Sequence, residues 1–262
     1  MNTSVIVPSL AYAAFLFAAG ETAAQGKTRP PVDKGVFVHL EKPSSSALAP
    51  AHFLLASAGI LDSIAASLNR RYLIPGRIDL TGKQCGSTTG GYAHATHSVV
   101  VCFELVEVIR NEWLQLARPD QQGSTTDHAT QLATTFVIHH EIGHALIDVL
   151  QIPTVGREED AADQFATVVQ LEMGNPEPVN SALFIFGAWA TRESTGALVA
   201  LGDAHELHVQ RMLNLVCWLY GSGAQVSPPL LSMLPETRRA GCHDEFSHVV
   251  ESWTRLLAPY SR

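Results

Sequence analysis

Basic residues are scarce in this chain of 262 residues. It holds 17 Lys and Arg against 25 Asp and Glu, which gives a formal net charge of −8. No stretch gathers basic and aromatic side chains into a surface that could follow a phosphate backbone. The composition therefore predicts that nucleic acid is not a partner of this protein.

Several short motifs of enzyme chemistry are also missing. The chain has no GxSxG, which excludes the usual nucleophile turn of serine hydrolases. The Gly-rich segment TGKQCGSTTGG, residues 81–91, lacks the Gly-Lys-Ser/Thr order of a phosphate-binding loop. No CxxC is present, which argues against a zinc site built from thiolates.

Cysteine is limited to four residues, Cys85, Cys102, Cys217 and Cys242. An even number can pair completely, and four cysteines allow three connectivities. The first two flank one short segment and the last two bracket another, so we expect each cysteine to pair with its neighbour in sequence. Four buried free thiols are the alternative if the protein is not exported.

The N-terminal segment MNTSVIVPSLAYAAFLFAAGETAAQGK has the pattern of a secretory leader. An apolar run from Val5 to Gly20 is followed by small residues up to Ala24, so we expect a signal peptide over residues 1–24. Export to the periplasm or outside the cell follows from this. An uncleaved membrane anchor is the alternative, and no other segment is expected to cross a bilayer.

Residues 25–35 are rich in proline and charge, and we expect them to form a flexible tether. A single domain is then expected over residues 36–262. Strand composition occurs at 36–41, 77–82 and 97–105, and one amphipathic helix is expected between Pro50 and Pro75. Further helices are expected at 105–117, 127–150, 158–173, 180–199, 204–220 and 243–257. This order predicts an α+β fold with a small N-terminal sheet packed on a larger helical part.

The segment TTFVIHHEIGHALIDVL, residues 134–150, places ionisable groups inside an apolar helix. Residues four apart on a helix differ by only about 40°, so His140 and His144 project from one face and can hold one ion. Glu141 lies beside that face, where it can reach a water molecule. His139 has Gly143 four residues later, so we expect it to pack elsewhere. Metal ligation would remove the cost of burying these groups unpaired.

A catalytic zinc site needs a third protein ligand and a vacant position. The segment GREEDAADQFA, residues 156–166, begins a helix with three acids, which the helix dipole favours at this end. Glu159 is the preferred third ligand, because Asp163 lies one turn further along the same face. From there Asp163 can accept a hydrogen bond from a ligating imidazole. Glu158 and Asp160 are the rival ligands.

The segments HEIGHALIDVL and GREEDAADQFA together resemble a bacterial family of predicted metallopeptidases that was first catalogued as a domain of unknown function. The similarity also covers VVVCFEL, HVQRMLNLVCWLYG and RRAGCHDEFSHVVESWTRLLAP, so it spans most of the chain from about Val36. The spacing from Glu159 to Asp163 is similar to that of the gluzincins, notably the integral-membrane prenyl-protein and heat-shock proteases. This resemblance implies a zincin-like fold, bound Zn²⁺, Glu159 as ligand, and a peptide or protein as substrate.

We therefore expect an exported zinc-dependent peptidase with Glu141 as the general base. A donor to the oxyanion is also required, and His205 is preferred to His208 and Tyr92. The exposed edge of a strand at residues 98–103 is expected to pair with an extended peptide. The alternatives are a zinc-stabilised binding protein without turnover and a metal-dependent hydrolase of non-peptide amides.

Two further side chains are expected near the centre. Arg211 is expected to pair with the acidic helix that carries Glu159. Asp148 lies one turn after His144, and we expect it either to pair with Arg157 or to support that histidine.

Overall fold

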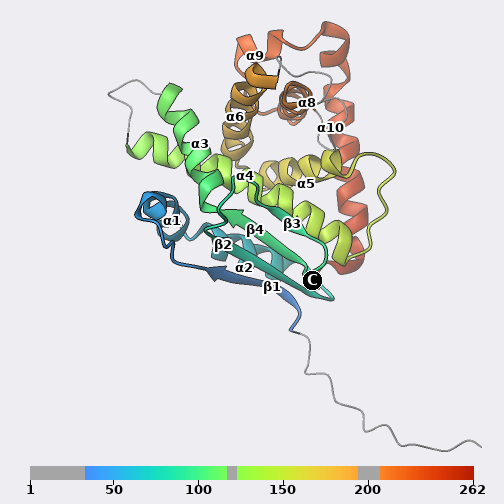
Figure 1. Cartoon of the computed structure of the whole chain (residues 1–262). Helices are drawn as coiled ribbons and strands as arrows, with labels where there is room; N and C mark the ends of the chain where they lie inside the picture. Colours follow the sequence, from blue (N-terminus) through green and yellow to red (C-terminus); the bar gives the residue numbers. More distant parts are fainter. Residues whose placement is uncertain (1–32, 117–122, 194–206) are drawn as a thin grey trace, which may run out of the picture. The chain divides into compact units, whose positions relative to one another are not determined.

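The sheet of this protein is small and is formed by the N-terminal part of the chain (Figure 1). The computed structural model describes residues 33–116, 123–193 and 207–262. Within these residues the sheet consists of β1 (Gly35–Leu40), β2 (Arg77–Lys83), β3 (Gly91–Ala93) and β4 (Ser98–Cys102). The chain after β4 is helical, so the predicted α+β class is confirmed.

The four strands are ordered β1-β2-β4-β3. The first three are parallel to one another, and β3 pairs antiparallel with β4, with Gly91 opposite Val100 and Ala93 opposite Ser98. Alternate residues of β2 are buried, among them Ile78 and Leu80, as expected for a strand with one face against the core.

The expectation that residues 98–103 offer a free strand edge is wrong. β4 is paired on one side by β2 and on the other by β3, so both of its edges are occupied. Phe103 already belongs to the first turn of α3. The edge strands of the described sheet are β1 and β3, and the Gly-rich composition around residues 86–91 gave no signal for β3.

Two helices replace the single helix expected between Pro50 and Pro75. They are α1 (Ala49–Ser57) and α2 (Ile60–Arg71), and Gly59 between them adopts a left-handed conformation with φ of 56°. By length and composition alone, the stretch Ser46–Arg71 could cross a membrane, contrary to our expectation. Its apolar side chains, among them Leu54 and Leu61, pack in the core of the fold, which is the behaviour of a core element.

Among the described residues, each of the six helices expected after residue 105 has a counterpart in the same order with different ends, and one short helix, α9, was not expected. They are α3 (Phe103–Leu116), α4 (Ser124–Val149), α5 (Glu158–Glu172), α6 (Glu177–Glu193), α8 (His208–Gly221), α9 (Pro228–Ser232) and α10 (Glu236–Leu257). α10 begins seven residues before the expected position 243, directly after Pro235, which fits the preference of proline for helix starts.

α4 is the central helix of the fold (Figure 1). It contributes Ile142 and Leu146 to the core shared with the sheet, Phe136 to a second core with α6 and α8, and Ala133 to a third core with α3 and α6. A helix with apolar contacts on every side has little water around its polar groups. A buried polar side chain on α4 is therefore costly unless it has a partner within the protein.

α4 and α5 approach each other closely at Gly143. A Cβ atom at this position would lie 3.0 Å from the Cα atom of Ala162 and 3.3 Å from its Cβ atom. The glycine of the HEIGH segment thus lets the two backbones come closer than two larger residues would allow. This contact fixes the distance between the side chains that the two helices direct toward each other.

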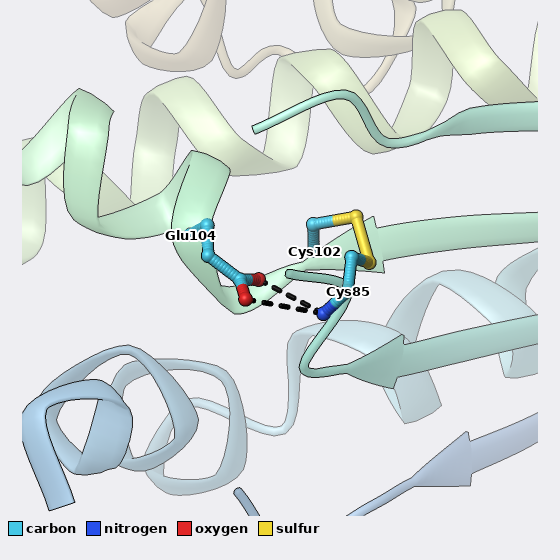
Figure 2. Close-up of side chains that lie close together, drawn as sticks. All are labelled: Cys85, Cys102 and Glu104. Carbon is cyan, nitrogen blue, oxygen red and sulfur yellow. Dashed lines mark hydrogen bonds between the residues drawn. A yellow bond between two sulfur atoms is a disulfide. The ribbon is translucent and has the colours of Figure 1, made fainter. Parts of the chain in front are cut away.

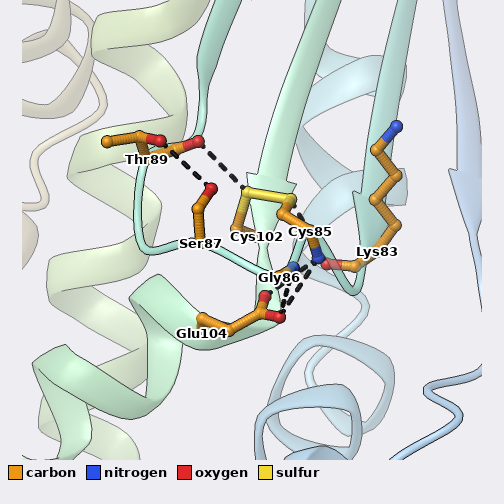
Figure 3. The surroundings of a disulfide bond; sticks show 7 residues. All are labelled: Lys83, Cys85, Gly86, Ser87, Thr89, Cys102 and Glu104. Carbon is orange, nitrogen blue, oxygen red and sulfur yellow. Dashed lines mark hydrogen bonds between the residues drawn. A yellow bond between two sulfur atoms is a disulfide. The ribbon is translucent and has the colours of Figure 1, made fainter.

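Both expected disulfides are present in the structure. Cys85 pairs with Cys102, and Cys217 pairs with Cys242. The first joins the chain after β2 to the end of β4, and Figure 2 shows the Glu104 carboxylate accepting hydrogen bonds from the Cys85 backbone N–H beside it. Figure 3 shows that the N–H of Gly86 donates to the same carboxylate. The second disulfide joins α8 to α10.

Replacing Gly143 with alanine tests the helix contact. Gly143→Ala is expected to lower the free energy of unfolding by about 1–3 kcal/mol, because the new methyl group overpacks against the α5 backbone. Gly241→Ala is the matched control, since Gly241 lies exposed within α10 and a Cβ atom there would meet nothing within 4 Å. Its substitution should raise stability by up to about 1 kcal/mol. Chemical denaturation of both variants measures the difference, and equal stabilities would contradict this account.

Candidate metal centre

Two imidazole rings from α4 meet on the side of the helix that faces α5. His140 and His144 are 5% and 9% exposed, and their Nε2 atoms are 3.2 Å apart. The spacing of four residues produces this geometry directly, since successive turns place the rings one above the other. Both Nε2 atoms point to the same small region.

The third group in this region is the carboxylate of Glu159, which lies in the first turn of α5. Its Oε2 atom is 3.2 Å from the His140 Nε2 atom, and its Oε1 atom is 3.5 Å from the His144 Nε2 atom. The potential donor atoms of these three residues lie within 4.8 Å of one another. Among the described residues this donor group includes neither Glu158 nor Asp160.

The spacing of these three donors fits a single zinc ion. Zinc binds imidazole nitrogen and carboxylate oxygen at about 2.0–2.1 Å in tetrahedral geometry, which requires neighbouring donors about 3.3 Å apart. The observed separations are 3.2, 3.2 and 3.5 Å. The donor types, two imidazoles and one carboxylate, also suit zinc. With three protein donors, a tetrahedral ion keeps one position for water or substrate.

The Nδ1 atom of each imidazole is held by a different carboxylate. His140 Nδ1 lies 2.8 Å from Asp163 Oδ1, and His144 Nδ1 lies 2.7 Å from Glu158 Oε1. A carboxylate accepts hydrogen bonds only, so each Nδ1 carries the hydrogen. The Nε2 atoms are then left to face the common region, which is the tautomer that a metal ligand requires.

Asp163 is in turn held by Arg211, which lies on α8. Arg211 donates from Nε to Asp163 Oδ2 and from Nη2 to Oδ1, each at 2.7 Å, and its guanidinium group stacks 4.2 Å above the Phe186 ring. Burial alone would raise the pKa of Asp163, but Arg211 and His140 outweigh it and hold the pKa well below its usual value. Asp163 is therefore an ionised acceptor although it is only 3% exposed.

The charges of the centre compensate one another. Burial would lower the pKa of His140, but Asp163 and Glu159 raise it to about 9. Burial would raise the pKa of Glu159, and the two imidazoles lower it instead. The centre without metal therefore holds a proton on His140 at neutral pH, in the place where a cation fits.

Glu141 stands beside this region on the neighbouring side of α4. Its Oε2 atom accepts a hydrogen bond of 2.8 Å from the backbone N–H of Tyr92 in β3. It lines an open cleft of about 510 Å³. The other lining residues are His144 of α4, then Arg157, Glu158 and Glu159 at the start of α5, and Gly90, Gly91, Tyr92 and His94 in and around β3. The carboxylate of Glu141 is thus accessible from the cleft without forming part of the three-donor group.

The residues considered as oxyanion donors have different positions. The Tyr92 hydroxyl donates to Asp148 Oδ2 at 2.7 Å, so it is already engaged. His208 packs against the rings of Phe186 and Trp189. His205, the preferred candidate, lies outside the described residues.

Two further expectations need correction or refinement. Asp148 contacts Tyr92, His94 and His97, whereas the sequence suggested Arg157 or His144 as its partner. The spacing of two helical turns shows that Asp148 shares a face of α4 with Glu141. It does not show which residues Asp148 contacts, because these belong to the hairpin of β3 and β4. Arg211 does pair with the acidic helix, as expected, through Asp163.

His139 points away from the centre, as the glycine at position 143 suggested. It is 4% exposed, and its Nδ1 atom lies 2.9 Å from the Thr135 carbonyl oxygen and 2.9 Å from the side-chain nitrogen of Gln170. Burial lowers the pKa of His139 to about 4, so this ring is neutral at physiological pH.

A second group of potential donors consists of Cys85, Cys102 and Glu104. Its two sulfur atoms form a disulfide and are not available as thiolates. Among the described residues, the three-donor group of α4 and α5 is therefore the one suited to a metal.

Comparison with known proteins agrees with this chemistry. Residues 40–257 match the model of a protein family described as "Putative metallopeptidase". No curated protein and no solved structure shows a significant match to the chain. Enzymes of this description are hydrolases that depend on a metal cofactor, which fits the donor group found between α4 and α5. Because the match covers most of the chain, the protein belongs to this metallopeptidase family.

Proposed function

We propose that this protein is an exported zinc-dependent peptidase of the gluzincin type, with Glu141 as its general base. The observation that carries the proposal is the convergence of the two Nε2 atoms and the Glu159 carboxylate, within 3.5 Å of one another, next to an accessible glutamate. Membership of a metallopeptidase family supports the same reaction class.

In this proposal His140, His144 and Glu159 hold the zinc ion, and Asp163 keeps the His140 ring in the required tautomer. Glu158 does the same for His144. Zinc in such a site polarises the scissile carbonyl and lowers the pKa of a water molecule toward about 7. The protein supplies the remaining steps through its own side chains.

Glu141 takes the proton from the attacking water and later delivers it to the leaving amine. One of its oxygens, Oε2, already accepts the Tyr92 N–H, so Oε1 is the atom assigned to proton transfer. The hydrogen bond from Tyr92 holds the carboxylate in one orientation beside the three donors. No covalent intermediate with the protein is required.

The substrate in this proposal is an extended peptide or a segment of a protein. β3 is an edge strand of the sheet, and its residues Gly91 and Tyr92 line the cleft that Glu159 of α5 and His144 of α4 also line. An extended peptide can add to such an edge through backbone hydrogen bonds other than that of the Tyr92 N–H, which donates to Glu141. His205 remains the proposed donor to the oxyanion.

Export is supported by the state of the cysteines. All four form disulfides, which persist in oxidising compartments such as the periplasm or the outside of the cell. The proposed organisation is a leader over residues 1–24, a tether over 25–35 and one domain over 36–262. The compact unit formed by residues 32–262 supports the last of these.

Glu141→Gln tests the assignment of the base. The variant should keep its zinc and lose about 100-fold or more of its activity on a mixed peptide library, because an amide cannot take up the proton. Glu41→Gln is the matched control, since Glu41 is exposed at the end of β1. Metal analysis and mass spectrometry of the cleaved peptides are the measurements.

The same experiment separates the rival functions. A wild-type protein that binds zinc and cleaves no peptide, with Glu141→Gln behaving identically, would favour a zinc-stabilised binding protein. Cleavage of simple amides without cleavage of peptides would favour an amide hydrolase. Full activity of Glu141→Gln would remove Glu141 from the mechanism.

The third ligand is tested by comparing two neighbouring glutamates. Glu159→Gln should weaken zinc binding by more than Glu158→Gln, because Glu158 contacts only the outer nitrogen of His144 and a glutamine oxygen can still accept that bond. Loss of an outer hydrogen-bond partner typically costs about 10- to 100-fold in metal affinity, which is the upper limit expected for Glu158→Gln. Competition with a chelator measures both, and the reverse order would reassign the ligand.

Zinc binding should release a proton and strengthen as the pH rises. The pKa of His140 is raised to about 9 in the metal-free protein, so below this pH the ion must displace a proton from the ring. Between pH 6.5 and 8.5 the apparent affinity should rise about tenfold for each pH unit. Calorimetry in buffers of different ionisation enthalpy measures the released proton, and an affinity independent of pH would contradict the assignment.

A further inference from the structure

Tyr92 contacts α4 at two separate points. Its backbone N–H donates to Glu141 Oε2 at 2.8 Å, and its hydroxyl group donates to Asp148 Oδ2 at 2.7 Å. Glu141 and Asp148 are seven residues apart, so they lie on one face of the helix at a distance of about 10 Å along its axis. One residue of the edge strand therefore spans two turns of the helix.

The hydroxyl end of this contact is reinforced by the hairpin between β3 and β4. His97 Nδ1 lies 2.8 Å from the Tyr92 hydroxyl oxygen and 3.1 Å from Asp148 Oδ2, and His94 Nδ1 lies 3.4 Å from the same carboxylate oxygen. His97 has a φ of 49°, a conformation that L-residues rarely adopt without support. The contacts with Tyr92 and Asp148 provide that support.

The protonation states suit a strong hydrogen bond between the two side chains. The bond from Tyr92 and the charges of the two imidazoles outweigh burial and lower the pKa of Asp148, so its carboxylate is ionised. Burial and the nearby Asp148 raise the pKa of Tyr92, so its hydroxyl keeps the proton that it donates. Hydrogen bonds to an ionised acceptor are stronger than those between neutral groups.

The two ends of the hairpin are thus fixed by different means. Next to Gly90, the Cys85–Cys102 disulfide closes one end, and a Cβ atom at Gly90 would lie 3.6 Å from the Cys102 sulfur atom. At the other end, after Ala93, the turn is held to α4 through Asp148. The backbone N–H of Tyr92 lies between these two points.

We propose that Tyr92 and Asp148 are positioning residues that hold β3 against α4, so that the Tyr92 N–H fixes the Glu141 carboxylate in the orientation needed for proton transfer. The inference rests on the proposed role of Glu141 as general base. The bond between the two side chains involves neither the Glu141 carboxylate nor the three zinc donors. Losing the tether should therefore affect turnover and the motion of β3, and leave zinc binding intact.

Four variants test the tether. Tyr92→Phe and Asp148→Ala each remove the bond between the side chains, and each should lower kcat about tenfold or more without a matching change in KM or zinc affinity. Asp148→Asn keeps an oxygen that accepts the Tyr92 hydroxyl, so it should restore most of the activity lost in Asp148→Ala. The double variant Tyr92→Phe/Asp148→Ala should be no slower than the slower single variant, because both changes break one interaction.

Hydrogen–deuterium exchange gives a readout that does not depend on activity. Backbone amides of residues 91–93 should exchange about tenfold faster in Tyr92→Phe and in Asp148→Ala than in the wild type. Tyr220→Phe is the matched control, because Tyr220 is an exposed tyrosine on α8, and it should alter neither exchange at 91–93 nor kcat.

Three outcomes would overturn the inference. Unchanged exchange at residues 91–93 would show that the contact does not hold β3. Faster exchange with unchanged kcat would show that the contact does not serve Glu141. A loss of zinc affinity together with the loss of kcat would show that the contact supports the whole centre and does not act on Glu141 alone. If the wild type cleaves no peptide, the proposed function fails, and the exchange comparison alone decides whether the tether exists.

Discussion

The close approach of α4 and α5 at Gly143 and Ala162 is the constraint on which the candidate centre depends. The two backbones lie so close at Gly143 that even a methyl group there would press against the backbone of α5. At this separation the Glu159 carboxylate reaches both imidazoles, and Asp163 reaches the outer nitrogen of His140. A shift of α5 by about one ångström would spoil these polar contacts together.

Because the two helices are so close, the charged groups between them are buried and need partners. Asp163 is almost fully buried, and an isolated buried carboxylate would be costly, but here it accepts two bonds from Arg211 and one from His140. The adjacent residues His139 and His140 show how strongly neighbouring groups affect the pKa of a buried imidazole. Carboxylates beside His140 raise its pKa to about 9. Burial lowers the pKa of His139 to about 4, although the bond with the Thr135 carbonyl acts against it.

The part of this arrangement that depends on local helix geometry could be predicted from the sequence. Helical spacing predicts that His140 and His144 share a face and that Asp163 follows Glu159 by one turn, and the structure has both relations. The break at Gly59 and the three-residue strand β3 were missed, because a left-handed glycine and a short edge strand leave almost no periodic signal. The contact between Tyr92 and Glu141 could not be predicted from the sequence. Every residue except proline has a backbone N–H, so the residue type gives no signal, and only the tertiary structure brings this N–H to α4.

The Cys85–Cys102 bridge has a consequence for cleavage of this chain by a protease. It joins the two sides of the segment that contains β3 and the turn after it, so one wall of the cleft lies within a covalently closed ring. A single cut anywhere inside that ring would leave both new chain ends attached to the molecule. Loop tips are preferred sites of nicking, and after such a cut the residues of this wall would remain covalently bound to the rest of the protein.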